Sequence, residues 1–302
     1  MQTRLVTTED ISQSVIAVPP LARDTDLKFL PAENQKIVSH IEQGGVRILL
    51  YGGNANFYHI RPGEFGEILS GLVEVALDDT LIIPAVGPAY GMMMDQADVL
   101  KDFDYPTVML LPQQGITSYA GVETGIRHFA EKFGKPIVLY IKHDGYIEVE
   151  NVKKLVDDGL VSFIKYAVVR DDPSDDPFLR NLIDVVDPAI IVSGIGEQPV
   201  IVHLRDFGLA GFTSGCVCVR PDLSAAMLKA CKAGDWGLAD EIRLKFTGLE
   251  DLRNEINPIR VLHDAVALAG IAETGPAVPF LSNLESGDKE RVKAAADSLL
   301  HC

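Results

Sequence analysis

The sequence repeats one arrangement eight times: a short apolar run is followed by a longer stretch with the composition of a helix. Each run is rich in Val, Ile and Leu, as expected of strands buried on both faces of a parallel sheet. The runs recur at the spacing of a strand-and-helix unit, about 25 to 30 residues. They occupy residues 14–20, 46–51, 81–86, 106–111, 136–142, 161–167, 189–193 and 209–213.

Eight such units predict a closed (β/α)8 barrel, the TIM barrel of the α/β class, over residues 1–221. After the last run the chain has helical patterns alone, so we expect residues 222–302 to form a helical region packed on the barrel. The competing fold is an open, doubly wound sheet, which predicts a glycine-rich phosphate-binding turn after the first strand. Residues 19–23 read Pro-Pro-Leu-Ala-Arg and contain no glycine, which favours the barrel.

The charge balance limits the kinds of partner. The 302 residues include 43 acidic and 27 basic side chains, a formal net charge of −16. This excess argues against nucleic acid or an anionic membrane as a partner, because both are themselves negative. It is compatible with a small-molecule substrate, and an anionic substrate would need a local cationic site.

The cysteines and the N-terminus point to a reducing location. Cys216, Cys218, Cys231 and Cys302 lack the CxxC pairs of structural zinc sites, and we expect no metal. The first ten residues contain acids and no apolar stretch, unlike a signal peptide. No apolar run reaches the ~18 residues that span a bilayer. The sequence therefore predicts a cytoplasmic protein with no membrane partner.

One buried run contains a lysine. Side chains alternate along a strand, so Val161, Phe163 and Lys165 share one face. An ammonium group on an apolar face is poorly solvated, so its pKa should fall, and a neutral amine is a nucleophile toward carbonyl carbons. The alternative is a lysine that extends from the strand end into solvent. Because chemistry in such barrels lies at the C-terminal ends of the strands, the position of Lys165 favours the nucleophile.

Two further side chains belong to the matching end of the preceding strand. Tyr140 and Lys142 share a face by alternation, with Lys142 one layer nearer the mouth. A nearby like charge lowers the pKa of Lys165 further, and a phenol can carry protons to and from a carbinolamine. Each residue alone could be ordinary barrel filling or a solvated strand end. Together they favour covalent catalysis by an amine.

Glycine-rich loops follow two of the strands. In residues 52–56, Gly52 and Gly53 let backbone N–H groups approach a ligand closely, and the side chain of Asn54 can add a donor. This turn is a candidate carboxylate site, although an ordinary strand-to-helix turn would look similar. Gly194, in Gly-Ile-Gly after the seventh strand, begins a second permissive loop on the same face.

These motifs together resemble the dihydrodipicolinate synthase/N-acetylneuraminate lyase family of class I, Schiff-base aldolases and dehydratases. Residues 52–56 lie where the family has G-[ST]-T-G-E, Tyr140 where it has its proton-shuttle tyrosine, and Lys165 where it has its imine-forming lysine. Residues 208–215 are similar to its G-x-x-G-x-x-S-G pattern. The resemblance covers nearly the whole chain and implies a (β/α)8 barrel with C-terminal helices, no cofactor beyond the lysine imine, and a homo-oligomer, either a dimer or a tetramer.

The sequence departs from the family pattern at several positions. Gly53 and Asn54 replace the two hydroxyl residues that hold the pyruvate carboxylate, and residues 112–114 read Pro-Gln-Gln where many members have Pro-Tyr-Tyr. Gly145 stands where the synthase has a substrate-binding arginine; Lys142 or His143 could meet a distal group instead. These differences argue against dihydrodipicolinate synthase activity itself while leaving the amine chemistry intact.

The resemblance implies a lyase that forms a Schiff base between Lys165 and a 2-oxo acid of the pyruvate type. The preferred reaction is aldol cleavage or dehydration of a 2-keto-3-deoxy sugar acid. Two alternatives remain open: condensation of pyruvate with an aldehyde, as in dihydrodipicolinate synthase, and a non-catalytic barrel that binds a 2-oxo acid. A metal-dependent aldolase would need His, Asp or Glu at several strand ends, and strands one to four and seven supply none.

Overall fold

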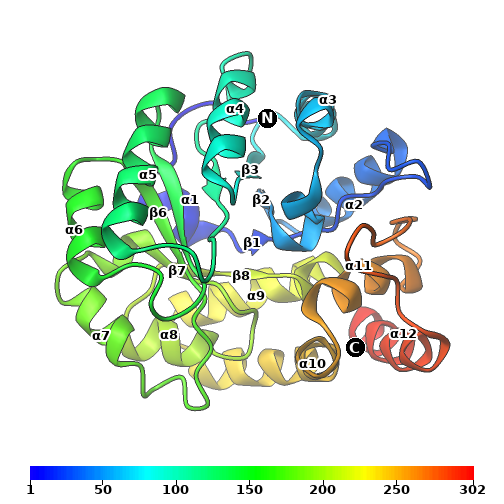
Figure 1. The fold of residues 1–302 in the computed structure, drawn as a ribbon. Coiled ribbons are helices and arrows are strands. Elements are labelled where there is room, and N and C mark those ends of the chain that lie inside the picture. Colours follow the sequence, from blue (N-terminus) through cyan, green and yellow to red (C-terminus); the bar gives the residue numbers. More distant parts are fainter.

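Eight parallel strands close into a barrel in the computed structural model, which describes residues 1–302. Each strand pairs with its neighbours in sequence order, and the first pairs with the last, so the barrel has no free edge (Figure 1). The predicted (β/α)8 fold is therefore confirmed. The strands are β1 (Ile16–Ala17), β2 (Ile48–Tyr51), β3 (Leu81–Val86), β4 (Met109–Leu110), β5 (Ile137–Ile141), β6 (Val161–Tyr166), β7 (Ile191–Ser193) and β8 (Gly211–Ser214).

Helices connect the strands and continue after the last one. Seven of them are α2 (Pro31–Gln43), α3 (Pro62–Val75), α4 (Tyr90–Leu100), α5 (Tyr119–Phe133), α6 (Val149–Asp157), α7 (Pro177–Ile183) and α8 (Val200–Asp206). A short α1 (Thr8–Gln13) precedes the barrel, and the C-terminal helices are α9 (Pro221–Lys232), α10 (Trp236–Glu255), α11 (Pro258–Leu268) and α12 (Ser286–His301). Four single 3-10 turns complete the set, at Gly53–Ala55, Phe57–His59, Pro188–Ile190 and Cys216–Cys218.

The largest differences from the sequence prediction are at the ends of elements. The first and fourth strands were expected over residues 14–20 and 106–111, and both are only two residues long. Both expected runs include proline, which has no N–H to donate to a ladder. Helix α1 was not predicted, yet its start is marked in the sequence: Thr7 and Asp10 form a reciprocal capping box.

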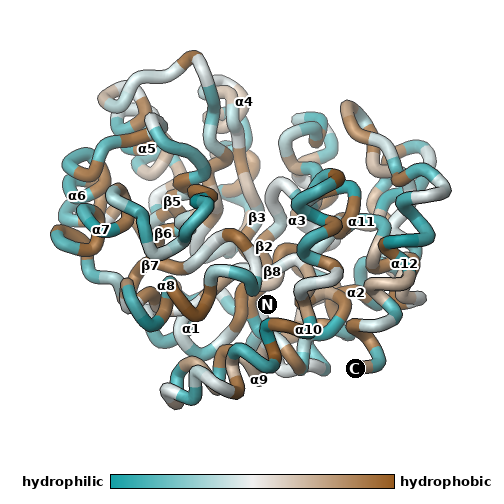
Figure 2. The backbone as a smooth tube through the Cα atoms, turned by 90° about the horizontal axis from the view of Figure 1, so that it is seen from below, coloured by the Kyte–Doolittle hydropathy of each residue, from teal (hydrophilic) through white to brown (hydrophobic).

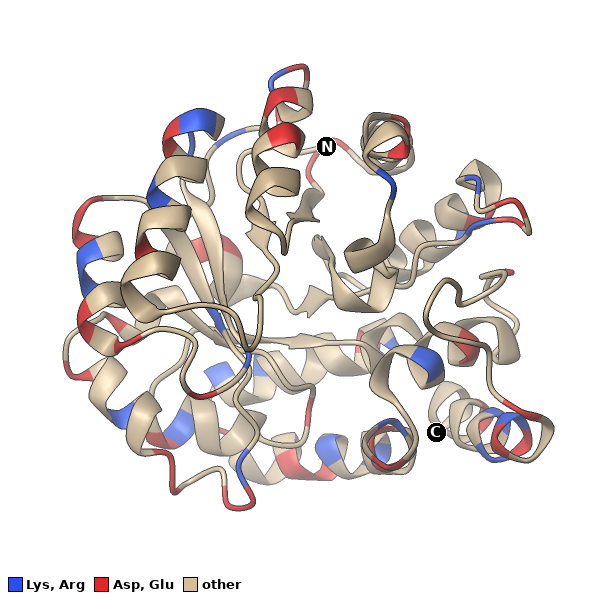
Figure 3. Cartoon of the chain, viewed as in Figure 1, with Lys and Arg blue, Asp and Glu red and all other residues tan.

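A single hydrophobic core joins the barrel to the C-terminal helices. It contains 86 buried residues, from Ile11 before β1 to Leu299 in α12. Hydrophobic stretches follow the central strands in Figure 2, and charged residues in Figure 3 are concentrated on the outer helices and loops. The exact division between residues 1–221 and 222–302 stays a prediction.

The C-terminal helices lie beside the barrel and beside one another. Helix α10 packs against α9, α11 and α12 and also contacts α8, so its C-terminal end is brought to the barrel (Figure 1). This placement matters for the site described below, because it carries side chains from outside the strand-helix repeat to the mouth of the barrel. None of the helices combines the length and apolar character of a membrane span.

Candidate functional site

The largest cavity opens at the C-terminal ends of the strands and has a volume of about 660 Å³. It is the location that the barrel fold predicts for a binding or active site. All seven residues proposed from the sequence line it: Gly52, Gly53, Asn54, Tyr140, Lys142, Lys165 and Gly194. His143 instead lines a smaller neighbouring cavity, together with Gln113 and Gln114.

Lys165 and Tyr140 lie side by side at the base of this cavity. They are paired across β5 and β6, with Tyr140 opposite Lys165 in the strand register. The Lys165 ammonium nitrogen lies over the Tyr140 ring, 4.4 Å from its centroid. Both residues are buried, at 6% and 9% exposed. The sequence predicted this proximity from strand alternation and from the neighbouring positions of the two strands.

The environment of Lys165 favours the neutral amine. Its pKa is lowered to about 7, chiefly by burial and in addition by the positive charges of Lys142 and Arg253. Lys165 forms no ion pair with a carboxylate, which would act in the opposite direction. The face of Tyr140 attracts a cation, but such contacts are worth only about 0.5–2 kcal/mol. At neutral pH a large fraction of Lys165 is therefore unprotonated and able to attack a carbonyl carbon.

Gly194 has a packing role against the lysine strand. A Cβ atom at this position would lie 2.7 Å from the Cβ of Ala167, 2.8 Å from the carbonyl oxygen of Tyr166 and 3.0 Å from Cγ of Lys165. Only glycine leaves room for the stem of the lysine beside β7. Its absent side chain also keeps this wall of the cavity open.

The glycine turn after β2 presents backbone to the cavity, but its amide side chain is already engaged. Gly53 begins a 3-10 turn, and the first N–H groups of such a turn have no acceptor within it. The Asn54 amide donates a hydrogen bond to the carbonyl oxygen of Val18 at 3.0 Å. One of the two N–H donors of the Asn54 amide therefore ties the turn to the segment after β1, and the expected role of this side chain toward a ligand stays a prediction.

Tyr58 is a member of the site that the sequence analysis missed. It lines both cavities, and the ammonium group of Lys142 lies 5.9 Å from the centroid of its ring. Burial raises the pKa of Tyr58 to about 12, so it is a neutral phenol at physiological pH. In the sequence, the only sign of this role was the position of Tyr58 just after the glycine turn. In the structure, a second 3-10 turn, Phe57–His59, places Tyr58 at the mouth of the barrel.

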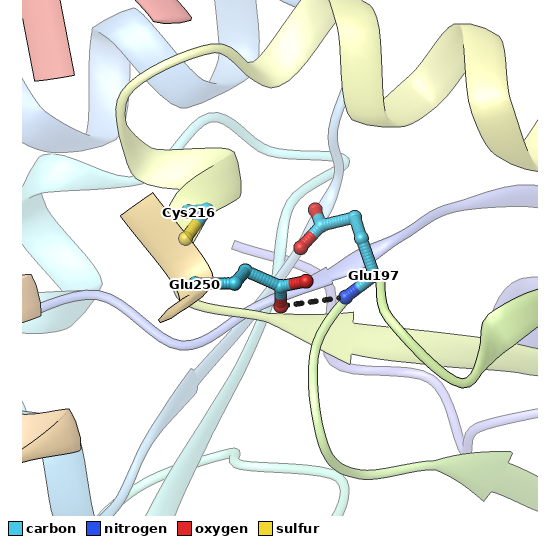
Figure 4. Close-up of side chains that lie close together, drawn as sticks. All are labelled: Glu197, Cys216 and Glu250. Atoms are coloured by element: carbon cyan, nitrogen blue, oxygen red, sulfur yellow. Dashed lines mark hydrogen bonds between the residues drawn. The ribbon is translucent and has the colours of Figure 1, made fainter. Parts of the chain in front are cut away.

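A second group of missed residues comes from α10. Arg253 lines the cavity, and its Nη1 donates to Oε1 of Glu250 at 3.3 Å. Glu250 is buried against Glu197, which follows β7, and against Cys216, with the ligand atoms of the three residues within 4.8 Å of one another (Figure 4). No pattern in the sequence connects α10 with the end of β7, because the connection depends on how the C-terminal helices fold back.

The cluster consists of residue types that could bind a metal, although the sequence analysis expected none. Hydrogen bonds within the chain hold its two carboxyl groups in place. The Glu197 N–H donates to Oε1 of Glu250 at 2.9 Å, and the Ser224 hydroxyl donates to Oε1 of Glu197 at 2.6 Å. Oε2 of each carboxyl group has no partner. Burial raises the pKa of both carboxyl groups, and two negative charges this close together in the interior are unfavourable.

The fold and site together define a (β/α)8-barrel protein with a buried, uncompensated lysine at the mouth of its barrel. No protein-family model matches the chain, and no curated protein matches it. Solved structures do. Dihydrodipicolinate synthase from Bacillus clausii has a TM-score of 0.83 and 21% identity, over 97% of this chain and 99% of that one.

Other similar structures belong to the same group. YagE, a prophage protein of the dihydrodipicolinic acid synthase family from E. coli K12 in complex with pyruvate, has a TM-score of 0.82 and 18% identity, over 96% and 99% of the two chains. DHDPS from Cyanidioschyzon merolae with lysine bound has a TM-score of 0.84 and 14% identity, over 96% and 98%. The chain therefore has the fold seen in dihydrodipicolinate synthase family structures, C-terminal helices included.

Proposed function

We propose that this protein is a class I lyase of the dihydrodipicolinate synthase/N-acetylneuraminate lyase family, which forms a Schiff base between Lys165 and a 2-oxo acid. The observation that carries the proposal is the buried Lys165 amine, with no counter-ion, beside a tyrosine at the base of the largest cavity. The fold shared with family structures, one of them in complex with pyruvate, supports the same conclusion.

In the first step the lone pair of Lys165 Nζ attacks C2 of the 2-oxo acid. The carbonyl π electrons move to oxygen, which takes a proton, and the nitrogen loses one, giving a neutral carbinolamine. Tyr140 is the group that relays these protons, since its phenol belongs to the residue paired with Lys165. A second proton then converts the C2 hydroxyl to water, which leaves as the nitrogen lone pair forms the C=N bond of a protonated imine.

The protonated imine then accepts electrons from the bonds at C3. Breaking C3–C4 with loss of the proton on the C4 hydroxyl gives an enamine and an aldehyde, which is aldol cleavage. Loss of a proton from C3, followed by departure of a hydroxyl group as water, is dehydration. We assign the C1 carboxylate to the N–H groups of the turn at Gly52, Gly53 and Asn54. Lys142 lies one layer nearer the mouth and would meet a more distant oxygen.

Our preferred substrate is a 2-keto-3-deoxy sugar acid, cleaved or dehydrated. The cavity volume of about 660 Å³ supports a substrate much larger than pyruvate. Condensation of pyruvate with an aldehyde uses the same imine and is the alternative reaction. A homo-oligomer, dimeric or tetrameric, is also part of the proposal.

The test is intact mass spectrometry after incubation with pyruvate and sodium borohydride, which reduces an imine to a stable amine. We expect one pyruvate-sized adduct on the wild type and none on Lys165→Met, which keeps the length of the side chain and removes the amine. Lys154→Met is the matched control, because Lys154 is exposed on α6 and should leave the adduct unchanged.

Absence of an adduct with pyruvate and with longer 2-oxo acids would refute the Schiff-base proposal and favour the non-catalytic binding barrel. An adduct that persists in Lys165→Met would show that another amine reacts. Peptide mapping of the reduced adduct identifies which lysine carries it.

A further inference from the structure

Arg253 provides a cation at the mouth of the cavity, and beyond its effect on the pKa of Lys165 the imine chemistry gives it no contact with the substrate. It belongs to the last turn of α10, and its side chain is 14% exposed. Its bond to Glu250 is the one hydrogen bond that its guanidinium group makes within the chain. A guanidinium group carries five N–H donors, so most of its donors remain for a ligand in the cavity that it lines.

Arg253 is held in place by Glu250, one of the two buried carboxyl groups of the cluster. Oε1 of Glu250 accepts the hydrogen bond from Arg253, and the Glu197 N–H donates to the same oxygen at 2.9 Å (Figure 4). Gly196 makes this approach possible. It has a φ of +101°, and a Cβ there would lie 2.9 Å from Nη1 of Arg253 and would overlap Oε1 of Glu250. The loop after β7 is therefore shaped around this arginine.

The other cations of the cavity are less suited to a distal anion. Arg170 is already paired with Asp144 and Asp176, at 2.6 Å and 3.1 Å. The ammonium group of Lys142 lies toward the ring of Tyr58. Asp171 is the one acidic residue lining the cavity. Arg253 is thus the cation with both free donors and a fixed position.

Arg253 lies beside the loop after β7, because a Cβ at Gly196 would lie 2.9 Å from its Nη1. The glycine turn follows β2, which β8 and β1 separate from β7, and Lys165 is on β6, next to β7 and across the barrel from β2. A 2-oxo acid bound to Lys165 with its C1 carboxylate on the turn would leave its other end for Arg253.

We propose that Arg253 binds a carboxylate at the far end of the substrate, so that this site selects 2-oxo acids with a negative charge at both ends. The proposal rests on the proposed function and narrows its substrate class from sugar acids in general to dicarboxylic ones. A planar guanidinium group suits this role because it can bind a carboxylate through two parallel hydrogen bonds.

The test is a competition in one tube between two 2-oxo acids of equal backbone length, trapped with borohydride and distinguished by adduct mass. The pairs are 2-oxoglutarate with 2-oxopentanoate, and 2-oxoadipate with 2-oxohexanoate. We expect the wild type to favour the dicarboxylate by about 10- to 100-fold in at least one pair. Arg253→Met should bring that ratio to about one, and Arg253→Lys should retain part of it. Because both acids react with the same lysine, changes in its protonation cancel in the ratio.

Other outcomes separate this inference from the one on which it rests. A pyruvate adduct without dicarboxylate preference, or a preference retained in Arg253→Met, would overturn the role of Arg253 and leave the Schiff-base proposal standing. A preference lost in Lys142→Met but kept in Arg253→Met would assign the role to Lys142. No adduct with any acid, pyruvate included, would overturn both. Adduct formation by the variants shows that they are folded, and Arg253→Lys keeps the charge beside Glu250 if Arg253→Met is unstable.

Discussion

Lys165 combines burial with two neighbouring positive charges, and it lacks the carboxylate partner that buried lysines usually have. Burial is the largest cause of its lowered pKa, followed by the charges of Lys142 and Arg253. An amine in this setting is deprotonated at a pH where an ordinary lysine is charged. Its reactivity should therefore depend on pH in a range accessible to experiment.

The rate of imine formation with pyruvate should rise as pH increases through about 7 and level off above it. The sign follows from the lowered pKa: the nucleophile is the neutral form, whose fraction grows on the alkaline side of that value. Initial rates of borohydride-trapped adduct between pH 5 and pH 9 measure this profile. In Lys142→Met the midpoint should move to higher pH because a repelling charge is gone. A wild-type midpoint near the ordinary lysine value of about 10.4 would contradict the prediction.

Tyr140→Phe keeps the ring beside Lys165 and removes the hydroxyl that relays protons. We expect the rate of imine formation to fall by about 10²-fold or more, because general acid–base catalysis contributes about 10²–10⁴-fold. The yield after long incubation should approach that of the wild type, since the lysine remains. Stopped-time trapping measures the rate. An unchanged rate would assign the proton relay to another group, with Tyr58 as the next candidate to substitute.

At the scale of elements, Gly194, which follows β7, lies so close to β6 that there is no room for a methyl group on its Cα. Gly194→Ala would push its Cβ against the Tyr166 carbonyl oxygen and the stem of Lys165. We expect a loss of about 1–3 kcal/mol of stability, as for overpacking of a core, together with slower adduct formation. Thermal unfolding and trapping measure the two effects. The control is Gly248→Ala on the exposed face of α10, where a Cβ meets nothing and should stabilise the helix by up to about 1 kcal/mol.

The start of α7 depends on one fully buried carboxylate. Asp176 caps the helix through the Leu179 N–H, accepts a hydrogen bond from the Tyr166 hydroxyl at 2.6 Å, and pairs with Arg170. Asp176→Ala should destabilise the fold by about 2–4 kcal/mol, because it removes the helix cap, leaves the buried Tyr166 hydroxyl without an acceptor and takes one carboxylate from Arg170. Chemical denaturation measures the loss. Asp175→Ala, at the exposed neighbouring position, should change stability by less than about 0.5 kcal/mol.

A helix or strand can be predicted from the sequence when the interactions that form it lie within its own segment. The helical character of α10 was predicted as part of the region 222–302, because a helical pattern is contained in the segment itself; its N-cap, Asp235, is local as well. Strand β4 was predicted over the six residues 106–111 and has only two, because the extent of its ladder depends on hydrogen bonding to its neighbours β3 and β5. The hydrogen bond from Asn54 to Val18 could not be predicted either, since it joins loops 36 residues apart.

At the scale of the whole molecule, the surface contains an exposed apolar area that could form the interface between copies of the chain in the expected oligomer. Ile116 is 80% exposed and Tyr90 is 50% exposed, and both line a shallow groove beside α5. If copies of the chain pack through this face, Ile116→Asp should shift the assembly toward smaller species, because it places a charge in an apolar interface. Sedimentation velocity measures the change. Wild-type protein that is monomeric would contradict the oligomer, and an unchanged assembly in Ile116→Asp would assign it to another face.

The site as a whole could be predicted in part. Residues on the strands, such as Lys165 and Tyr140, follow from alternation and from the rule that barrel strands present their C-terminal ends to one mouth. Arg253 could not be found in this way, because it lies 88 positions after Lys165 on a helix outside the repeat. Its contact with the cavity depends on how α10 packs against the barrel. Hydrophobic periodicity predicts that a segment is a helix, but it does not predict where that helix packs.

The reacting groups and the proposed selecting group are thus encoded in separate parts of the gene. Tyr140 and Lys165 lie in the fifth and sixth repeats, whereas Arg253 lies in a helix outside the strand-and-helix repeat. Mutations in α10 could therefore change which substrate is accepted while the covalent chemistry is preserved. For protein engineering, a small library at the last turn of this helix offers a direct route to new specificities on an unchanged reactive centre.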